Sequence, residues 1–219
     1  MGRRGDGVTR RHGERTPATP SPTLPVPPSP PWRVFCAAEL PDDVRERLRE
    51  HIQQLRAAVP DAAASWTRVE NIHLTLKFFG NVDVHRIVAI SDAASRAVAQ
   101  FSPVQIGVGT TGVFPKPSRA QVLWIGVSDY SGALSTLQRQ LENECAKKGF
   151  EKEGRAYRPH LTIARLRKPE GARQLADSHL QMKFEPVDIE LKELVVFRSE
   201  LSSKGSRYTA IARHKLLPR

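Results

Sequence analysis

The sequence predicts an α+β fold made of two similar lobes, and three observations support this prediction. Strand-like and helix-like segments follow one another along the whole chain after residue 32. The segment VDIELKELVVF at 187–197 alternates apolar and polar residues, as an antiparallel strand with one covered face does. The sequence His-Leu-Thr-aliphatic occurs twice, at 73–76 and at 160–163. We therefore expect these copies to be equivalent strands of the two lobes.

The first half of the chain predicts two strands and two helices. A strand is expected at 33–40, and a helix follows in which Pro41 suits the first position and two aspartates suit the positive end of the dipole. Its apolar stripe is Val44, Leu48, Ile52 and Leu55. The second strand covers 71–80 and ends at a glycine, and the second helix covers 83–100.

The second half predicts five strands and two further helices. Strands are expected at 103–109 and 120–129, separated by a proline-containing loop at 110–119. A helix spans about 131–148 and ends at a glycine, the next strand covers 160–166, and a short helix covers 170–180. The last two strands, at 187–201 and 206–216, pair around the turn SSKG.

Residues 1–32 differ in kind from the rest of the chain. They hold 8 of the 17 prolines, five arginines and almost no large apolar residue. Such a segment cannot bury enough surface to offset the entropy of ordering, so we expect a disordered basic tail. It lacks the apolar core of a secretory signal. The remaining residues, 33–219, are expected to form one domain.

The formal charge of +11 favours a polyanionic partner, although a basic protein without such a partner would also fit. No apolar run reaches the roughly 18 residues that a membrane span needs. Cys36 and Cys145 form neither a metal-binding spacing nor a redox pair, so we expect two reduced thiols and a cytoplasmic protein.

The repeated sequence has a direct geometric meaning. Side chains alternate faces along a strand, so His73 shares a face with Thr75, and His160 shares a face with Thr162. The intervening aliphatic residues point into the core of a lobe. If the two strands face each other, two imidazoles and two hydroxyl groups converge.

Two histidines suit acid–base chemistry on phosphorus. With an unperturbed pKa of about 6.5, one imidazole can accept a proton while the other donates one. Threonine hydroxyl groups can donate to the non-bridging phosphate oxygens. A single such histidine would more often be structural, but two copies favour a site. Zinc needs three or four ligands, and no third ligand recurs at a fitting offset, so we expect neither a metal nor another cofactor.

Twin His-x-Thr-x motifs half a chain apart resemble the 2H phosphoesterase superfamily, in particular its RNA 2′,3′-cyclic phosphodiesterase branch, also called 2′-5′ RNA ligases. The resemblance extends over nearly all of 33–219. It includes, in order, RVFCAAELPDDVRERL, WTRVENIHLTLKFFGNV, GVFPKPSRAQVLWIGV, YRPHLTIARLR and ELVVFRSEL…RYTAIAR. It implies a bilobal fold, with antiparallel sheets and outer helices around a central basic cleft.

The resemblance also implies roles. It makes His73 the proton donor to the leaving O3′ and His160 the proton acceptor that activates water. It gives Thr75 and Thr162 the task of binding phosphate, and it predicts a 2′-phosphate product. The residues alone leave the two histidines interchangeable.

Four residues are candidates for substrate binding. The resemblance makes Arg165 a phosphate ligand, but simple alternation places it on the face opposite His160, so it reaches the cleft only if the strand bulges. By the same alternation Lys77 shares the face of His73. Its side chain could then lie in the cleft or extend into solvent, and the sequence favours neither. Tyr157 and Phe114 could stack on bases.

Trp124 is expected in the core. The histidines without a threonine partner are expected at helix surfaces or strand ends: His51, His85, His179 and His214.

The predicted enzyme is a monomeric RNA 2′,3′-cyclic phosphodiesterase that needs no metal and acts on RNA or small 2′,3′-cyclic nucleotides. Two alternatives remain from the sequence. The same site could join RNA ends through a 2′-5′ linkage, because the reaction is reversible in principle. A basic RNA-binding module could also hold a phosphate without turnover.

Overall fold

The computed structural model describes residues 1–2, 30–167, 171–202 and 205–218 of this chain. The tail expected at 1–32 therefore falls largely outside the described residues, as do the predicted start of the fourth helix at 170 and the centre of the SSKG turn. Trp32, which the sequence placed in the tail, is the first residue of the first strand, where it pairs with Val82.

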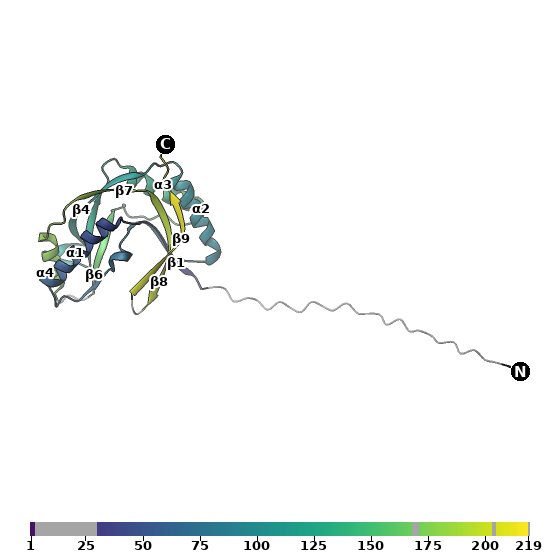
Figure 1. Cartoon of the computed structure of the whole chain (residues 1–219), viewed down its shortest axis with the longest axis horizontal. Helices are drawn as coiled ribbons and strands as arrows, with labels where there is room; N and C mark the ends of the chain where they lie inside the picture. Colours follow the sequence, from purple (N-terminus) through teal and green to yellow (C-terminus); the bar gives the residue numbers. More distant parts are fainter. Residues whose placement is uncertain (3–29, 168–170, 203–204, 219) are drawn as a thin grey trace.

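Two antiparallel sheets form the molecule (Figure 1). The four-stranded sheet has the order β3-β1-β8-β9, and the five-stranded sheet has the order β2-β6-β5-β4-β7. The strands are β1 (Trp32–Ala38), β2 (Ala64–Trp66), β3 (Leu74–Val82), β4 (Val104–Phe114), β5 (Val122–Ser128), β6 (His160–Leu166), β7 (Val187–Leu191), β8 (Glu193–Ser202) and β9 (Gly205–Lys215). This arrangement confirms the predicted α+β fold of two lobes.

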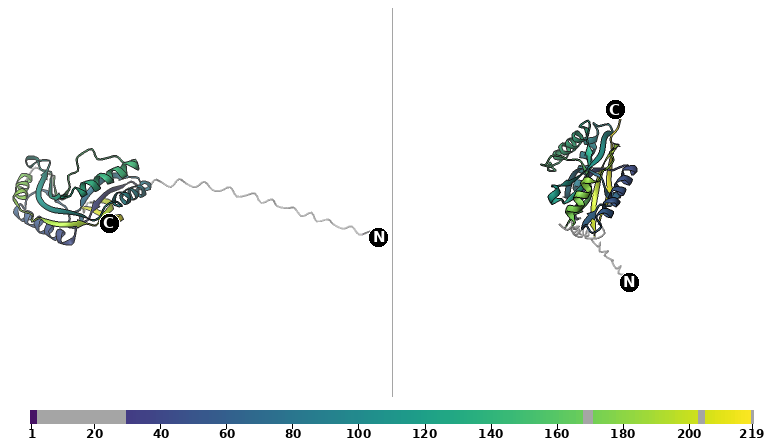
Figure 2. Two further views of the ribbon diagram at one scale, coloured as in Figure 1. Left: turned by 90° about the horizontal axis from the view of Figure 1, so that it is seen from above. Right: turned by 90° about the vertical axis from the view of Figure 1, so that its left-hand side faces the viewer.

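In the described part of the chain, four helices cover the outer faces of the sheets (Figure 2). They are α1 (Asp42–Ala58), α2 (Ile87–Val98), α3 (Ala133–Lys147) and α4 (Ala172–Gln181). Helices α2 and α3 pack together on the four-stranded sheet, whereas α1 and α4 pack together on the five-stranded side. Short 3₁₀ turns lie at Val69–Asn71, Val84–Arg86 and Pro117–Arg119. One continuous apolar core joins both lobes, because a single cluster of buried side chains contains residues of both sheets.

Strand β4 is longer than the sequence indicated. The expected loop at 110–119 begins only after Phe114, because a bulge between Gly109 and Thr111 lets the strand continue. Thr110 takes a φ of 60° at this bulge, which a β-branched residue adopts only under strong constraint.

The strand expected at 187–201 is two strands in different sheets. β7 pairs with β4, and β8 pairs with β1 and β9. The break falls at Lys192, between β7, which ends at the buried Leu191, and β8, where Leu194 to Phe197 are buried on both faces. The short strand β2 was not predicted.

Two histidines expected at helix surfaces are buried instead. His51 of α1 is 4% exposed, His179 of α4 is fully buried, and Nε2 of His51 lies 3.1 Å from Nδ1 of His179. Nε2 of His179 lies 3.0 Å from the Trp124 carbonyl oxygen, so it carries the proton, and His51 donates to His179. Burial lowers the pKa of both imidazoles, that of His51 to about 4.

Candidate active site

A cleft of about 500 Å³ brings together all four residues of the twin motifs. Both sheets contribute to it, because His73 and Thr75 come from the edge of the four-stranded sheet and His160 and Thr162 come from β6. Among the described residues that line the cleft there is no carboxylate. Three arginines line it, namely Arg33, Arg165 and Arg167. The cleft is therefore a positively charged cavity suited to an anion.

The same backbone contact fixes the tautomer of each cleft histidine. Nδ1 of His73 lies 2.8 Å from the carbonyl oxygen of Asn71, and Nδ1 of His160 lies 2.7 Å from that of Arg158. In both cases the partner is two residues earlier in the chain. A carbonyl oxygen only accepts, so Nδ1 carries the proton and Nε2 keeps its lone pair. Each histidine therefore offers Nε2 to a substrate.

The two imidazoles have different aromatic surroundings. His73 precedes β3 rather than starting it, and its ring stacks on Phe35 with centroids 4.6 Å apart, while Tyr208 meets it edge-on at 5.3 Å. His160 is the first residue of β6, and Phe114 meets it edge-on at 5.0 Å.

Both histidines are half-buried, and desolvation lowers both pKa values. Burial lowers the pKa of His73 to about 4, because the hydrogen bond to Asn71 only partly offsets the loss of water. The pKa of His160 is also lowered, mainly by burial and further by the positive charge of Arg165. Without a bound anion, both rings are neutral at pH 7.

A β-bulge follows the threonine in both motifs. In β3, Thr75 pairs with Ala37 but Lys77 pairs with Cys36, so Leu76 is an extra residue. In β6, Thr162 pairs with Trp124 but Ala164 pairs with Leu123, so Ile163 is the extra residue. The fourth residue of each His-x-Thr-x motif is thus the bulged one. Beyond it, the residues that face the cleft are shifted by one position.

This shift brings Arg165 into the cleft, together with His160 and Thr162. The sequence left this possibility open and tied it to a bulge, and the bulge at Ile163 is present. Phe78 occupies the equivalent position after the first motif, where it also lines the cleft and is 50% exposed. The guanidinium of Arg33 lies over its ring, 4.6 Å from the centroid.

The same shift takes Lys77 out of the cleft, which corrects the placement expected from simple alternation. Its Nζ donates to Glu142 of α3 at 2.6 Å and to the carbonyl of Glu151 at 2.8 Å. The Lys77 and Glu142 side chains are only 4% and 8% exposed. Lys77 lines a separate hollow of about 580 Å³, so its position favours a structural role rather than substrate contact.

The two aromatic candidates lie beside the cleft rather than among its lining residues. The Tyr157 hydroxyl donates to the Thr75 carbonyl at 3.2 Å, and burial raises the pKa of this phenol. Tyr157 thus ties the segment before His160 to the first motif. Phe114 packs between Trp124 and His160, with its ring centroid 5.2 Å from that of Trp124. Trp124, which was expected in the core, is only partly buried, and its ring centroid lies 6.4 Å from that of His160.

Several lining residues were not singled out from the sequence, namely Arg33, Phe35, Thr67, Asn71, Phe78, Arg167, Ser199, Leu201, Ser206 and Tyr208. Most of them lie within the sequence blocks that carried the family resemblance. Nothing in their spacing indicated that β1 and the β8–β9 hairpin meet at the two histidines.

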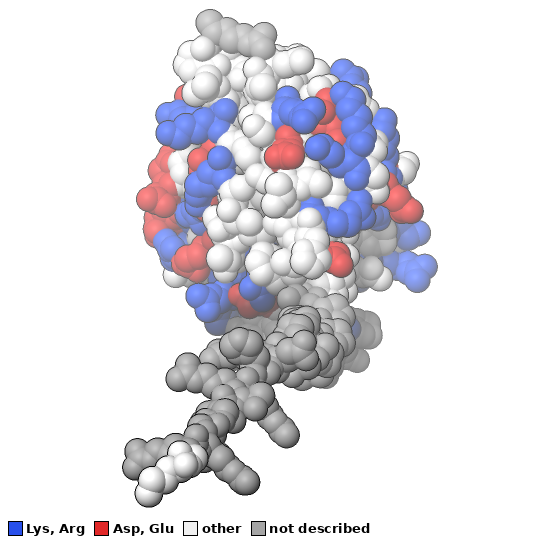
Figure 3. All heavy atoms as spheres, turned by 90° about the vertical axis from the view of Figure 1, so that its right-hand side faces the viewer, with Lys and Arg blue, Asp and Glu red and all other residues white. Residues whose placement is uncertain are grey.

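Within the described ranges, no three His, Cys, Asp or Glu residues gather as a metal-binding group. No helix in this part of the chain is long and apolar enough to cross a membrane. Basic side chains also occupy more of the surface than acidic ones on the flank drawn in Figure 3.

Comparison with known sequences identifies the family. The sequence model of the 2′-5′ RNA ligase superfamily matches residues 40–202. A Methanothermobacter thermautotrophicus protein named RNA 2′,3′-cyclic phosphodiesterase is 34% identical over 178 residues, which cover 81% of this chain and 95% of that protein. A Methanocaldococcus jannaschii protein of the same name is 28% identical, with coverages of 82% and 98%. The chain belongs to the 2′-5′ RNA ligase superfamily, as its twin motifs predicted.

Solved structures agree with this family. Escherichia coli LigT in its apo form has a TM-score of 0.66 and 26% identity, and the match covers 87% of this chain and 100% of LigT. LigT complexed with 3′-AMP gives a TM-score of 0.66 and 25% identity, covering 85% of this chain and 98% of LigT.

Proposed function

We propose that this protein hydrolyses RNA 2′,3′-cyclic phosphate ends to 2′-phosphate ends by two-histidine acid–base catalysis. The observation that carries this proposal is the pair of imidazoles in one cationic cleft, each with Nδ1 held by a backbone carbonyl and Nε2 free for substrate. The names of the relatives and the family match support the same reaction.

The reaction needs one proton acceptor and one proton donor. Nε2 of His160 takes a proton from water as the water oxygen forms a bond to phosphorus. The bond from phosphorus to O3′ breaks, and Nε2 of His73 gives its proton to the departing oxygen. The products are a 2′-phosphate and a 3′-hydroxyl group. The assignment of donor and acceptor follows the family resemblance, and no step in this scheme requires a metal ion.

The donor must acquire its proton with the substrate. Burial keeps both imidazoles neutral in the empty cleft at pH 7, and the pKa of His73 is about 4. A cyclic phosphodiester carries one negative charge, which favours an imidazolium beside it and raises the pKa. Substrate binding therefore supplies the electrostatic condition for an acid and a base to coexist.

Thr75, Thr162 and Arg165 are suited to hold the phosphate. The hydroxyl groups can donate to non-bridging oxygens from both lobes, and a guanidinium binds such oxygens in a fixed fork. Phe78 lines the cleft and is half-exposed, so it is placed to contact a base or ribose, whereas Phe114 supports the His160 ring from the side.

The test is turnover of an oligonucleotide with a 2′,3′-cyclic phosphate end, followed by phosphorus NMR. We expect a 2′-phosphate product, a bell-shaped pH–rate profile and no effect of chelator. His73→Ala and His160→Ala should each lower kcat by about 10²- to 10⁴-fold, the usual contribution of a positioned acid or base. His85→Ala is the matched control, because His85 is exposed and outside the cleft. Near wild-type turnover by either cleft variant would exclude the mechanism, and a 3′-phosphate product would reverse the leaving group.

The description of the matched family also favours a joining reaction, in which two RNA ends are linked through a 2′-5′ bond. A 5′-hydroxyl group would then replace water as the nucleophile while O3′ still leaves, so His160 would remain the proton acceptor and His73 the proton donor. Incubating RNA halves that carry cyclic-phosphate and 5′-hydroxyl ends measures this activity, and the ratio of joined to hydrolysed product shows which direction prevails. Stoichiometric binding of a cyclic-phosphate end without turnover would instead indicate an RNA-binding module.

A further inference from the structure

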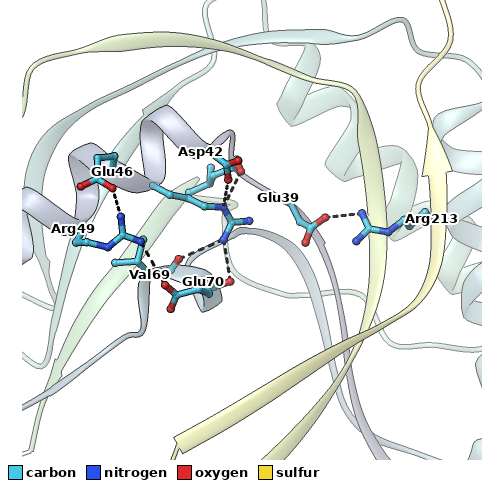
Figure 4. A network of polar contacts seen from close by, with 9 residues as sticks. Glu39, Asp42, Glu46, Arg49, Val69, Glu70 and Arg213 are labelled. Carbon is cyan, nitrogen blue, oxygen red and sulfur yellow. Dashed lines mark hydrogen bonds and ion pairs between the residues drawn. The ribbon is translucent and has the colours of Figure 1, made fainter.

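The 3₁₀ turn before His73 is held in place by an arginine of α1. Arg45 donates from Nε to the Leu40 carbonyl at 3.0 Å and from Nη1 to the Glu70 carbonyl at 3.0 Å. Glu70 is also the partner of Arg49, as the network in Figure 4 shows. These contacts fix the backbone on one side of Asn71, the last residue of the turn.

Asn71 has two separate bonding roles. Its Nδ2 donates to the Ser206 carbonyl of β9 at 2.7 Å. Its own carbonyl oxygen accepts the Nδ1 proton of His73 at 2.8 Å. One residue therefore connects the β8–β9 hairpin to the carbonyl that sets the tautomer and direction of the His73 ring.

The end of this hairpin forms one wall of the cleft. β1 pairs with β8 only as far as Ser199, whereas β8 and β9 continue to pair with each other up to Ser202 and Gly205. In Figure 1 the hairpin extends past the rest of the sheet. Its residues Leu201, Ser206 and Tyr208 line the cleft, and the Tyr208 ring contacts His73 edge-on.

Among the described residues, no hydrogen bond ties the segment before His160 to the hairpin in this way. Its Nδ1 partner is the carbonyl of Arg158, and the next carbonyl, that of Pro159, accepts from the Val127 amide of the neighbouring strand at 3.3 Å. The five-stranded sheet itself thus fixes the backbone before His160. The two motifs are alike in tautomer and bulge, but their ties differ: Asn71 bonds the β8–β9 hairpin, whereas Tyr157, before His160, bonds the Thr75 carbonyl of the first motif.

We propose that Asn71 is a positioning residue, which couples the β8–β9 hairpin to the orientation of His73. This inference rests on the proposed function, in which His73 exchanges a proton with the substrate. When Asn71 holds Ser206, the hairpin wall and the imidazole keep one fixed geometry. When that bond is lost, the Asn71 carbonyl and the His73 ring are free to turn together.

Kinetics on a 2′,3′-cyclic-phosphate oligonucleotide test the proposal. Asn71→Ala should lower kcat by about 10- to 100-fold, the usual cost of a misplaced catalytic group, while KM changes by less than about threefold. Asn71→Asp keeps the shape but cannot donate to the Ser206 carbonyl, so it should lower kcat as well. Asn143→Ala is the matched control, because it removes an asparagine contact to Lys152 outside the cleft and should leave kcat unchanged. A loss confined to KM would make Asn71 a substrate contact and overturn the positioning role.

A second measurement does not depend on turnover. In protein with ¹⁵N-labelled histidine, the His73 signals, assigned with His73→Ala, should report the Nδ1–H tautomer. Asn71→Ala should shift them toward an average of both tautomers and speed hydrogen exchange at 205–208. Unchanged signals and exchange would overturn the coupling. If the wild-type protein shows this coupling but does not turn over the oligonucleotide, the proposed function fails and the structural link stands.

Discussion

Arg165 is the side chain whose position depends most on a local irregularity of the backbone. A regular β6 would direct it away from His160, and the bulge at Ile163 returns it to the cleft. There its charge acts on His160 and lowers the pKa of that imidazole. The arginine that we propose as a phosphate ligand therefore also influences the protonation of His160.

Arg165→Ala should lower kcat/KM by about 10- to 100-fold, because a hydrogen bond to a charged group contributes about 1.5–3 kcal/mol. It should also move the acid limb of the pH–rate profile to higher pH. The sign follows from the charge: Arg165 lowers the pKa of His160, so its removal raises that pKa, and the base becomes protonated at a higher pH. Steady-state kinetics from pH 5 to 9 measure both effects.

Arg139→Ala is a suitable control for this change, since Arg139 is exposed on α3 and outside the cleft. Arg165→Lys separates charge from shape, and it should restore the acid limb more fully than kcat/KM. An unchanged kcat/KM for Arg165→Ala would remove Arg165 from the site.

At the scale of the elements, alternation along a strand predicted part of the site and failed at the bulges. Each histidine and its threonine are two residues apart, so regular alternation placed them on the same face. Thr75 and Thr162 do line the cleft together with the histidines. Lys77 lies beyond the bulge, and its expected face was wrong. The neighbours Ile163 and Ala164 carried a readable signal, because two adjacent apolar residues break the alternation of polar and apolar residues that begins at His160. In β3 the residue that corresponds to Ala164 is Lys77, which continues the alternation, so the sequence does not reveal that bulge.

Lys77→Ala should destabilise the fold without affecting substrate binding. Glu142 would be left as a buried carboxylate without its cation, which costs about 3–5 kcal/mol. Chemical denaturation should show this loss, while KM for the cyclic-phosphate oligonucleotide stays at the wild-type value. Lys77→Met combined with Glu142→Gln should recover much of the stability, because neither residue then brings a charge into the core. A raised KM in the folded Lys77→Ala protein would return Lys77 to the substrate.

At the scale of the whole molecule, the family and most of the order of elements could be read from the sequence, apart from β2 and the division between β7 and β8, but the contacts between distant helices could not. His51 and His179 are 128 positions apart, and each stands on an amphipathic helix whose pattern does not reveal its neighbour. Their burial follows from the packing of α1 on α4.

The His51–His179 pair predicts a loss of stability in mild acid. The folded state holds the pKa of His51 at about 4, below its unfolded value of about 6.5. The unfolded chain therefore binds a proton first as the pH falls, so the stabilisation is complete above pH 6.5 and is lost progressively toward pH 4. Thermal unfolding between pH 7.5 and 4.5 measures this loss of stability.

His51→Gln, which can still donate to His179, should reduce the loss relative to wild type. His85→Gln should not, since His85 is exposed. Equal acid sensitivity of wild type and His51→Gln would contradict this account.

The large apolar cluster that spans both sheets has a consequence for the geometry of the site. The chain passes from sheet to sheet several times, and α1 leaves a strand of the four-stranded sheet to pack on the opposite side. Neither lobe can therefore rotate against the other without breaking the apolar cluster that both share. The fold itself therefore sets the distance between the two imidazoles, without closure of one lobe on the other. Under the proposed function, a phosphate would therefore enter an opening whose geometry already exists before binding.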